Sequence, residues 1–259
     1  MRVSARELDL LGARAWPPLE DAFIDGWQLR FSGGVTKRAN SVLPLGDNDQ
    51  PLLGKTVLAE RIAAVERSYA AHGLPARFQV TASSQPPDLR DVLAKRGYVE
   101  SDRTLVMTVE LATRQSRHPS SWRIVEQQPE PPRDWLDAWW AADGRGGATE
   151  LGVARTILAR IELPRMFVEC HDERGVAGVG LGVLDLPWIG IYCMATLPHA
   201  RRQGCARSIL AHLFSQATMR GAERAHLAVT ETNEPARRLY QTFGFETRQE
   251  YSYFTLSSV

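Results

Sequence analysis

Residues 191–207 read IYCMATLPHARRQGCAR, and this stretch decides the fold. Its first part, up to Ala195, is mostly apolar, as a buried strand would be. After a turn at Pro198 and the sequence RRQGCA at 201–206, residues 206–219 carry apolar side chains at 206, 209, 210, 213, 214 and 217. That spacing is typical of an amphipathic helix, which Gly221 would cap at its C-terminal end. The stretch therefore predicts a strand, a short turn and a helix.

The turn between this strand and this helix has the composition of an anion-binding loop. Gly204 has no Cβ, so the backbone there can approach a ligand closely. The first N–H groups of a helix have no partner within the helix, and the helix dipole adds positive potential at the same end. Arg201, Arg202 and Arg207 add formal positive charge. These features favour a site for a pyrophosphate, and the alternative is a basic loop that only starts a helix.

A second motif follows this helix. Residues 226–229 form the short apolar run of a buried strand, and the chain continues as NEPARRLYQTFGF at residues 233–245. Asn233 is a good helix-capping residue, so a short helix is expected from there to about Thr242, where Gly244 would end it. The sequence thus predicts a second strand followed closely by a helix.

In this order and spacing, the two motifs resemble those of the GNAT superfamily of acyl-CoA N-acyltransferases. The first family motif is a strand ending in V-x-P, followed by R/Q-x-x-G-x-G/A at the start of a helix. Thr196-Leu197-Pro198 and residues 201–206 stand in those places. The second family motif, N-x-x-A-x-x-L-Y-x-x-x-G-F, matches residues 233–245. The resemblance is clear over about residues 122–256 and weak before them.

The resemblance also implies what individual residues do. The pyrophosphate of acetyl-CoA would be bound, mainly through backbone N–H groups, by Arg201, Arg202, Gln203, Gly204, Cys205, Ala206 and Arg207. The pantetheine arm would pair with Met194, Ala195 and Thr196, which would place an N–H on the thioester carbonyl as a stabilising donor. Asn233 would contact the arm from the opposite side. Tyr240 would protonate the departing thiolate, and its alternative is a core aromatic on a helix face.

Transfer to an amine also requires a base, because amines of the lysine type titrate near ~10.4 and are mostly charged at neutral pH. The sequence does not single one out among five available groups, which are Glu150, Glu169, Asp185, Glu231 and Tyr192. Cys193 and Cys205 flank the motif without a histidine paired to them. Direct transfer in a ternary complex is therefore favoured over a thiol-linked intermediate.

A polar, Pro-rich stretch over residues 113–132 indicates a linker. We place the boundary so that residues 1–118 and 119–259 form separate domains. Both halves end in the same order, a helix, a short strand, a short helix, a Gly-aromatic pair and a strand, with Gly97-Tyr98 and Gly244-Phe245 as the pairs. This order favours a divergent internal duplication over a chance recurrence of a common connection.

The predicted fold class is α+β, or mixed α/β: a GNAT-type mixed, mostly antiparallel sheet flanked by helices, with two GNAT-like units in tandem. The first half lacks the arginine loop before its helix, and Leu93 or Ala94 stands where the second half has Tyr240. We therefore expect residues 1–118 to be degenerate and non-catalytic. Within them, a helix is predicted over residues 5–15, and two strands over 26–31 and 39–45.

Composition excludes several other classes of function. The 259 residues carry 31 basic and 30 acidic side chains, a net charge of +1, which argues against nucleic acid as the main partner. No run approaches the roughly 20 apolar residues of a membrane span, and the first residues are charged where a signal peptide is apolar, so a cytoplasmic protein without a membrane partner is expected. The three cysteines have no metal-type spacing, which predicts free thiols and no metal.

The sequence thus predicts an acetyl-CoA-dependent N-acetyltransferase, with acetyl-CoA as co-substrate and an amine-bearing acceptor as second partner. The acceptor amine and the oligomeric state stay open. Two alternatives remain: a non-catalytic CoA-binding regulatory protein, and an acyltransferase that uses a longer acyl-CoA.

Overall fold

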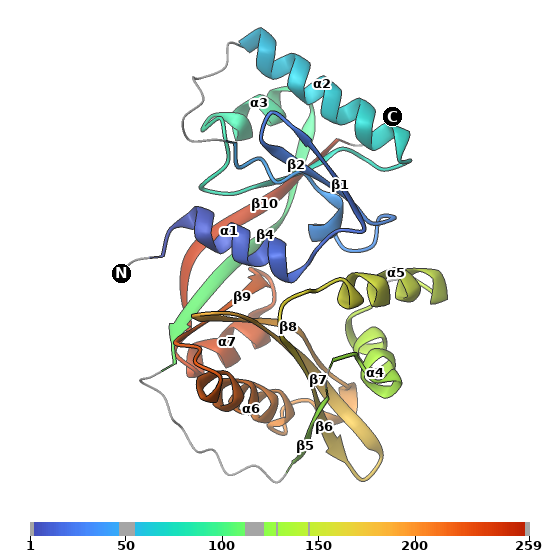
Figure 1. Cartoon of the computed structure of the whole chain (residues 1–259), viewed down its shortest axis with the longest axis vertical. Helices are drawn as coiled ribbons and strands as arrows, with labels where there is room; N and C mark the ends of the chain where they lie inside the picture. The colour runs from blue at the N-terminus through green and yellow to red at the C-terminus, as the bar shows by residue number, and fades with distance from the viewer. Residues whose placement is uncertain (1–2, 47–54, 112–121, 128, 145, 257–259) are drawn as a thin grey trace. The chain divides into compact units, whose positions relative to one another are not determined.

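The computed structural model describes residues 3–46, 55–111, 122–127, 129–144 and 146–256. The chain forms two compact units, one of Met1–Leu105 with Gln249–Val259 and one of Val106–Arg248 (Figure 1). The domain boundary predicted between residues 118 and 119 falls at 112–121, outside the described residues. The units divide elsewhere, within two long strands.

The first unit combines helices with two small groups of strands. Its elements are α1 (Ala5–Ala15), β1 (Glu20–Ile24), β2 (Trp27–Phe31), a 3-10 helix (Arg38–Asn40), α2 (Lys55–Ala71), β3 (Arg77–Val80), α3 (Leu89–Lys95) and parts of β4 (Tyr98–Glu110) and β10 (Glu246–Leu256). Strands β1 and β2 form an antiparallel pair. Strand β10 lies between β3 and β4 and runs antiparallel to β3.

The prediction of a strand over residues 39–45 is wrong. Only isolated bridges form there, from Val42 to Phe78 and from Leu43 to Gln28. Asn40 explains the difference, because its side chain accepts hydrogen bonds from the N–H groups of Ser32 (2.7 Å) and Gly34 (2.9 Å). These bonds hold the chain in a closed turn, and such local bonds compete with strand pairing.

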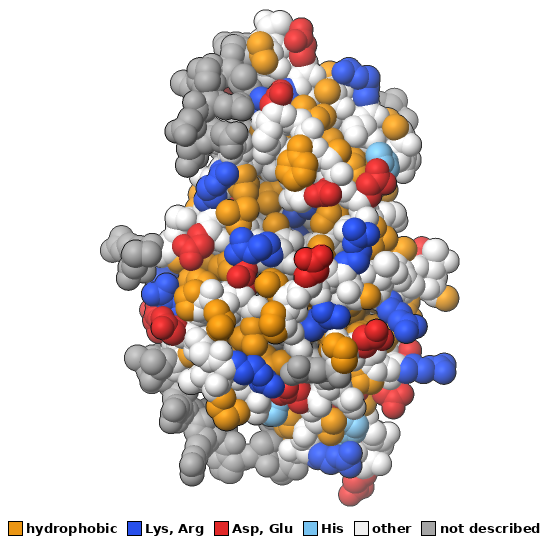
Figure 2. Space-filling view, in the orientation of Figure 1, with side chains coloured by type: hydrophobic (Ala, Val, Ile, Leu, Met, Phe, Trp, Pro, Cys, Tyr) orange, Lys and Arg blue, Asp and Glu red, His pale blue; other side chains and the backbone are white. Residues whose placement is uncertain are grey.

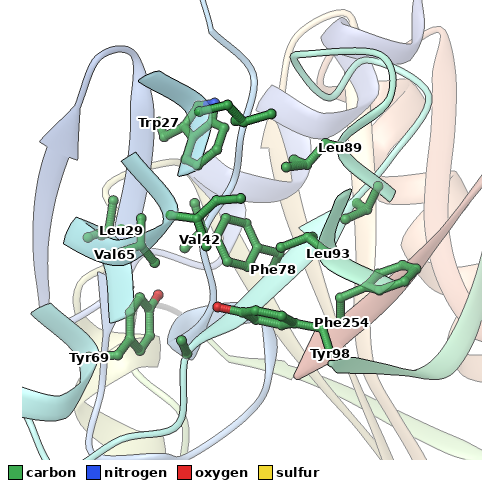
Figure 3. Close-up of a cluster of buried hydrophobic side chains, with 14 of the residues drawn as sticks. Trp27, Leu29, Val42, Val65, Tyr69, Phe78, Leu89, Leu93, Tyr98 and Phe254 are labelled. Carbon is green, nitrogen blue, oxygen red and sulfur yellow. The ribbon is translucent and has the colours of Figure 1, made fainter. Parts of the chain in front are cut away.

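The core of the first unit includes a residue from the end of the chain. Phe78 contacts Trp27 and Tyr98 edge to face, with ring centroids 5.5 Å apart in both pairs (Figure 3). Phe254, on β10, belongs to the same buried cluster. The fold of the first unit therefore requires the last strand of the second half.

The second unit is built on a mixed sheet. Its elements are β5 (Arg123–Gln127), α4 (Arg133–Asp143), α5 (Ala148–Ala159), β6 (Arg165–Asp172), β7 (Gly175–Asp185), β8 (Trp188–Thr196), a 3-10 helix (Pro198–Ala200), α6 (Cys205–Met219), β9 (Arg224–Thr230) and α7 (Glu234–Thr242). Strands β5 to β8 pair antiparallel in sequence order, and β8 and β9 are parallel. Helices α4 and α6 both pack on this sheet, on opposite faces (Figure 1). This confirms the predicted fold class.

The repeated order of elements is also present. The series α2, β3, α3 and β4 matches α6, β9, α7 and β10, and the glycines before the last strands, Gly97 and Gly244, have φ of +91° and +82°. Strand β10 lies between β3 and β4, while β4 lies beside β9. Strands β4 and β10 are each divided between the two units, so no single chain position separates the units.

Two surface features bear on possible partners. On the face shown in Figure 2, positive and negative side chains are interspersed, in keeping with the net charge of +1. Among the helices of the described residues, none has both the length and the apolar character that a bilayer crossing requires.

Candidate active site

A bulge interrupts β8 where the site begins. Val179 on β7 pairs with Ala195, and Leu181 pairs with Tyr192, so two residues of β8 face one residue of β7. Cys193, the first of the two, has a φ of +50°, in the left-handed region that non-glycine residues rarely occupy. The pairing of β8 with β9 ends just before it, at Ile191. The bulge therefore redirects the end of β8 where its pairing with β9 stops.

A cavity of about 690 Å³ adjoins this end of β8, within the range of small-molecule sites. Its walls come from β8, the loop and first turn of α6, one side of α7 and the end of α4. Of the residues predicted from the sequence, those that line it are Met194, Ala195, Thr196, Arg201, Arg202, Gly204, Cys205, Ala206, Arg207, Asn233 and Tyr240. Gln203, also predicted, is not among the described lining residues. Its side-chain Nε2 donates to the backbone carbonyl of His199 (2.7 Å), and its backbone carbonyl accepts from the indole N–H of Trp122 (2.9 Å).

The first turn of α6 forms one end of the cavity. Gly204 precedes the helix with a φ of +88°, which a residue with a Cβ would adopt only with strain. The Nε of Arg201 donates to the carbonyl of Thr196 (3.2 Å), and an Nη of Arg207 donates to Thr242 (3.0 Å). The free N–H groups of the turn and these guanidinium groups make this end suited to anions.

Three glycines of β7 allow α6 to pack close to the sheet. A Cβ on Gly178 would lie 2.4 Å from the Sγ of Cys205 and 2.9 Å from the carbonyl oxygen of Ala195. A Cβ on Gly180 would lie 2.6 Å from Ile209 of α6. Gly178, Gly180 and Gly182 therefore leave the space that α6 occupies against β7.

Tyr240, on α7, also lines the cavity. Its side chain is buried, with 7% of the residue exposed, and its ring packs against Phe245 with centroids 5.8 Å apart. Burial raises the pKa of Tyr240 to about 12, and the negative charge of Asp143 adds to the effect. The phenol therefore keeps its proton at neutral pH and can donate it.

Asn233 begins α7, as the sequence predicts. Its Oδ1 accepts a hydrogen bond from the N–H of Ala236 (3.3 Å). The same residue lines the cavity, so the cap that orients α7 is also part of the wall.

We expect Asn233→Ala to lower the free energy of unfolding by about 1 kcal/mol, because the first turn of α7 loses its cap. Asn233→Asp is the matched control, since a carboxylate caps equally well. Urea unfolding of the three proteins measures the effect. An Asn233→Ala variant with the urea midpoint of the wild type would contradict the capping role.

Sequence reasoning missed Asp143, the last residue of α4. It lines the cavity beside Tyr240, although it lies about a hundred residues before the second motif. The signal available was its position, since an acidic residue at the C-terminal end of a helix is electrostatically unfavourable.

The five groups considered as bases lie outside the described lining of the cavity. Glu169 is buried and bonds His171 (2.9 Å), and Glu150 accepts from the N–H of Gly147 (2.7 Å) at the start of α5. Position relative to the cavity therefore selects none of these five groups as the base.

Comparison with known proteins identifies the family. A family model described as "Probable histone acetyltransferase Rv0428c C-terminal" matches residues 3–254, which include both units. The chain belongs to this acetyltransferase family. The match extends well beyond the two motifs, so the first half is part of what the family shares.

Curated relatives support the same assignment. The acetyltransferase is 28% identical over 250 residues to the "Uncharacterized N-acetyltransferase YobR" of Bacillus subtilis (strain 168), covering 96% of this chain and 97% of the relative. A second relative from the same organism, "Uncharacterized N-acetyltransferase YsnE", is 39% identical over 83 residues, 31% of this chain and 55% of that protein. The family match and the names of these relatives together identify the chain as an acyltransferase.

Solved structures show the same fold at low identity. A GCN5-related N-acetyltransferase from Kribbella flavida aligns with a TM-score of 0.72 and 15% identity, over 100% of this chain and 97% of that one. A tandem GNAT protein from the clavulanic acid biosynthesis pathway aligns with a TM-score of 0.67 and 14% identity, over 99% and 90%. These alignments confirm the GNAT resemblance and the tandem arrangement.

Proposed function

We propose that this acetyltransferase binds acetyl-CoA in the cavity at the end of β8 and transfers the acetyl group to a primary amine. The observation that carries the proposal is that one cavity joins the arginine-rich N-terminus of α6 to a buried, protonated phenol. Acetyl-CoA needs both features, since it is anionic at one end and releases a thiolate at the other.

In this proposal the pyrophosphate occupies the anion end. The N–H groups of the first turn of α6 would bind it, and Arg201, Arg202 and Arg207 would add charge, as Arg does at many phosphate sites. The pantetheine arm would lie along residues 194–196, where the bulge interrupts the ladder of β8. Asn233 would contact the arm from the side of α7.

The transfer then takes place in one ternary complex. The amine nitrogen attacks the thioester carbonyl carbon, the C–S bond breaks, and the electron pair goes to sulfur. Tyr240 donates its proton to that sulfur, and the nitrogen loses a proton to water or to a base. A thiolate neutralised as it departs lowers the barrier to C–S cleavage.

The structure also bears on the choice between direct transfer and an acetylated enzyme. Cys205 lines the cavity, but its thiol is in hydrogen-bonding contact with Cys170 and Thr196, and its Sγ sits over Gly178. A thiol that acts as the nucleophile would have to face the thioester. The contacts of the Cys205 thiol with these neighbours therefore support direct attack by the amine.

Thiol release tests the proposal. Acetyl-CoA would be incubated with primary amines, including a lysine peptide because the family description names a histone acetyltransferase. We expect CoA release that depends on the amine, and no acetyl adduct on the protein in intact mass spectra with acetyl-CoA alone. Release with no amine dependence, or a stoichiometric acetyl adduct, would contradict it.

A further inference from the structure

Two cysteine side chains meet beneath the first turn of α6. Cys170 on β6 and Gly178 on β7 are paired in antiparallel register, so side chains at these two positions lie on the same face of the sheet. The Sγ of Cys205, from α6, lies on this face, 2.4 Å from where a Cβ on Gly178 would be. The two thiols are in hydrogen-bonding contact, and neither forms a disulfide. The missing side chain of Gly178 thus leaves the space in which they meet.

The two thiols differ in what can reach them. Cys205 is the first residue of α6 and lines the cavity of about 690 Å³, so a small molecule that enters the cavity meets it. Cys170 lies within the sheet with 0% of the residue exposed, and it is not among the described lining residues. An oxidant that enters the cavity therefore reacts first at Cys205, with Cys170 held in contact as a second thiol.

The hydrogen bond between the thiols makes Cys205 the more reactive of the two. This bond, together with burial, raises the pKa of Cys170, which therefore keeps its proton and donates the bond. The same bond lowers the pKa of Cys205, a hydrogen bond from Thr196 acts in the same direction, and burial opposes both. The positive potential at the N-terminal end of α6 also favours a thiolate there. Cys205 thus has the properties of an attacking thiol, and Cys170 has those of a resolving thiol.

We propose that Cys170 and Cys205 form a site of reversible oxidation, at which a peroxide converts the two thiols into a disulfide that weakens acetyl-CoA binding. The effect on acetyl-CoA rests on the proposed function, but the disulfide itself does not. The reaction is separate from acyl transfer, in which neither sulfur takes part.

The oxidation balances with hydrogen peroxide as the oxidant. The Cys205 thiolate attacks one peroxide oxygen, the O–O bond breaks, and the departing hydroxide takes up a proton to become water, which leaves Cys205 as a sulfenic acid. The sulfur of Cys170 then attacks the sulfenic sulfur, the S–O bond breaks, and hydroxide leaves as water with the proton of Cys170. Two thiols and one peroxide thus give one disulfide and two waters. A dithiol reverses the change by thiol–disulfide exchange.

Disulfide formation moves the first turn of α6. Two sulfurs in hydrogen-bonding contact must come closer to form a covalent bond. Cys170 is held in the sheet by strand pairing on both sides, with Ile124 of β5 and with Gly178 of β7. Cys205 follows Gly204 at the end of a helix, so most of the displacement falls on Cys205 and on the N–H groups of its turn. These are the N–H groups proposed to bind the pyrophosphate, and their displacement weakens that binding.

Peroxide treatment of the full chain tests the inference. Wild type, Cys170→Ser and Cys193→Ser are each oxidised with hydrogen peroxide and mapped by mass spectrometry of non-reduced peptides. Each is titrated with acetyl-CoA by calorimetry before oxidation, after oxidation and after dithiothreitol. Cys193→Ser is the matched control, because it removes the third cysteine and keeps both members of the pair. Cys170→Ala is a second variant at the buried position, and it adds no hydroxyl to the core.

We expect a cross-link between Cys170 and Cys205 in the wild type and in Cys193→Ser. Acetyl-CoA affinity should fall by about tenfold or more, as for the loss of one hydrogen bond to a charged group. Dithiothreitol should restore it, which excludes oxidation of Met194 as the cause, because a dithiol does not reduce a methionine sulfoxide. Cys170→Ser and Cys170→Ala should form no cross-link, and dimedone should trap a sulfenic acid on Cys205.

The same measurements separate this inference from the proposed function. The inference alone is wrong if the reduced proteins bind acetyl-CoA but the wild type forms no such cross-link, pairs Cys193 in its place, or forms it with unchanged affinity. If the reduced proteins do not bind acetyl-CoA, the proposed function fails and the effect on affinity fails with it, while the peptide map still decides the disulfide. Acetyl-CoA binding by the reduced Cys170 variants also shows that they are folded.

Discussion

Tyr240→Phe should lower kcat for amine acetylation by about 10²–10⁴-fold, the usual range for loss of a positioned proton donor. The substitution removes only the hydroxyl, and the ring keeps its contact with Phe245. Binding of acetyl-CoA should stay nearly the same, because the anion end of the cavity is untouched. Stopped-flow thiol release and calorimetry measure the two quantities separately.

The leaving group provides a sharper form of this test. An acetyl thioester of an aromatic thiol releases a weakly basic thiolate that needs little protonation, so the deficit of Tyr240→Phe should shrink with it. Tyr98→Phe, in the first unit, is the control and should leave kcat unchanged. A Tyr240→Phe deficit below about threefold, or one that is equal for both thioesters, would contradict the acid role.

The pH profile should agree with the same role. Burial raises the pKa of Tyr240 from 10.0 to about 12, so the folded protein retains this proton as pH rises. Any stability linked to the shift is complete below pH 10 and is lost between pH 10 and 12, as the unfolded chain and then the folded one titrate. We expect kcat to show no alkaline decline from Tyr240 below about pH 10.

Gly178→Ala should lower the free energy of unfolding by about 1–3 kcal/mol, the cost of inserting a methyl group into a packed core. The new Cβ would lie 2.4 Å from the Sγ of Cys205 and 2.9 Å from the carbonyl oxygen of Ala195. Both neighbours line the cavity, and one of them is a backbone atom. The first turn of α6 must shift, so acetyl-CoA should also bind more weakly.

Urea unfolding and calorimetry measure these effects. Gly12→Ala is the control: no heavy atom lies within 4 Å of the added Cβ, and in helix α1 the change should stabilise by about 0.5–1 kcal/mol. Adding Cys205→Ala to Gly178→Ala should recover part of the stability, because it removes one of the two close contacts. If Gly178→Ala keeps the stability and acetyl-CoA affinity of the wild type, the packing argument is wrong.

Local sequence patterns were enough to predict the helices that form much of the cavity wall. The apolar spacing after residue 205 predicted α6, and Asn233 predicted the start of α7. Both signals are contained within a few residues. The loop at residues 201–207 was found for the same reason, since a helix start carries its own glycine and charges.

Features that depend on distant contacts were not predicted. At the bulge, Cys193 has a left-handed backbone conformation although it is not a glycine. The surrounding strand pairing imposes this conformation, and no local sequence pattern indicates it. Asp143 reaches the cavity only because α4 packs on the sheet. The place of β10 between β3 and β4 could not be predicted either, because the sequence of a strand does not specify which strands it pairs with.

The most direct test of the account is a calorimetric titration of the full chain with acetyl-CoA. We predict one site per chain, because only the second half has the arginine loop and Tyr240. The dissociation constant should fall between about 1 μM and 1 mM, and free CoA should compete. No binding at about 1 mM acetyl-CoA, or two equivalent sites per chain, would contradict the account.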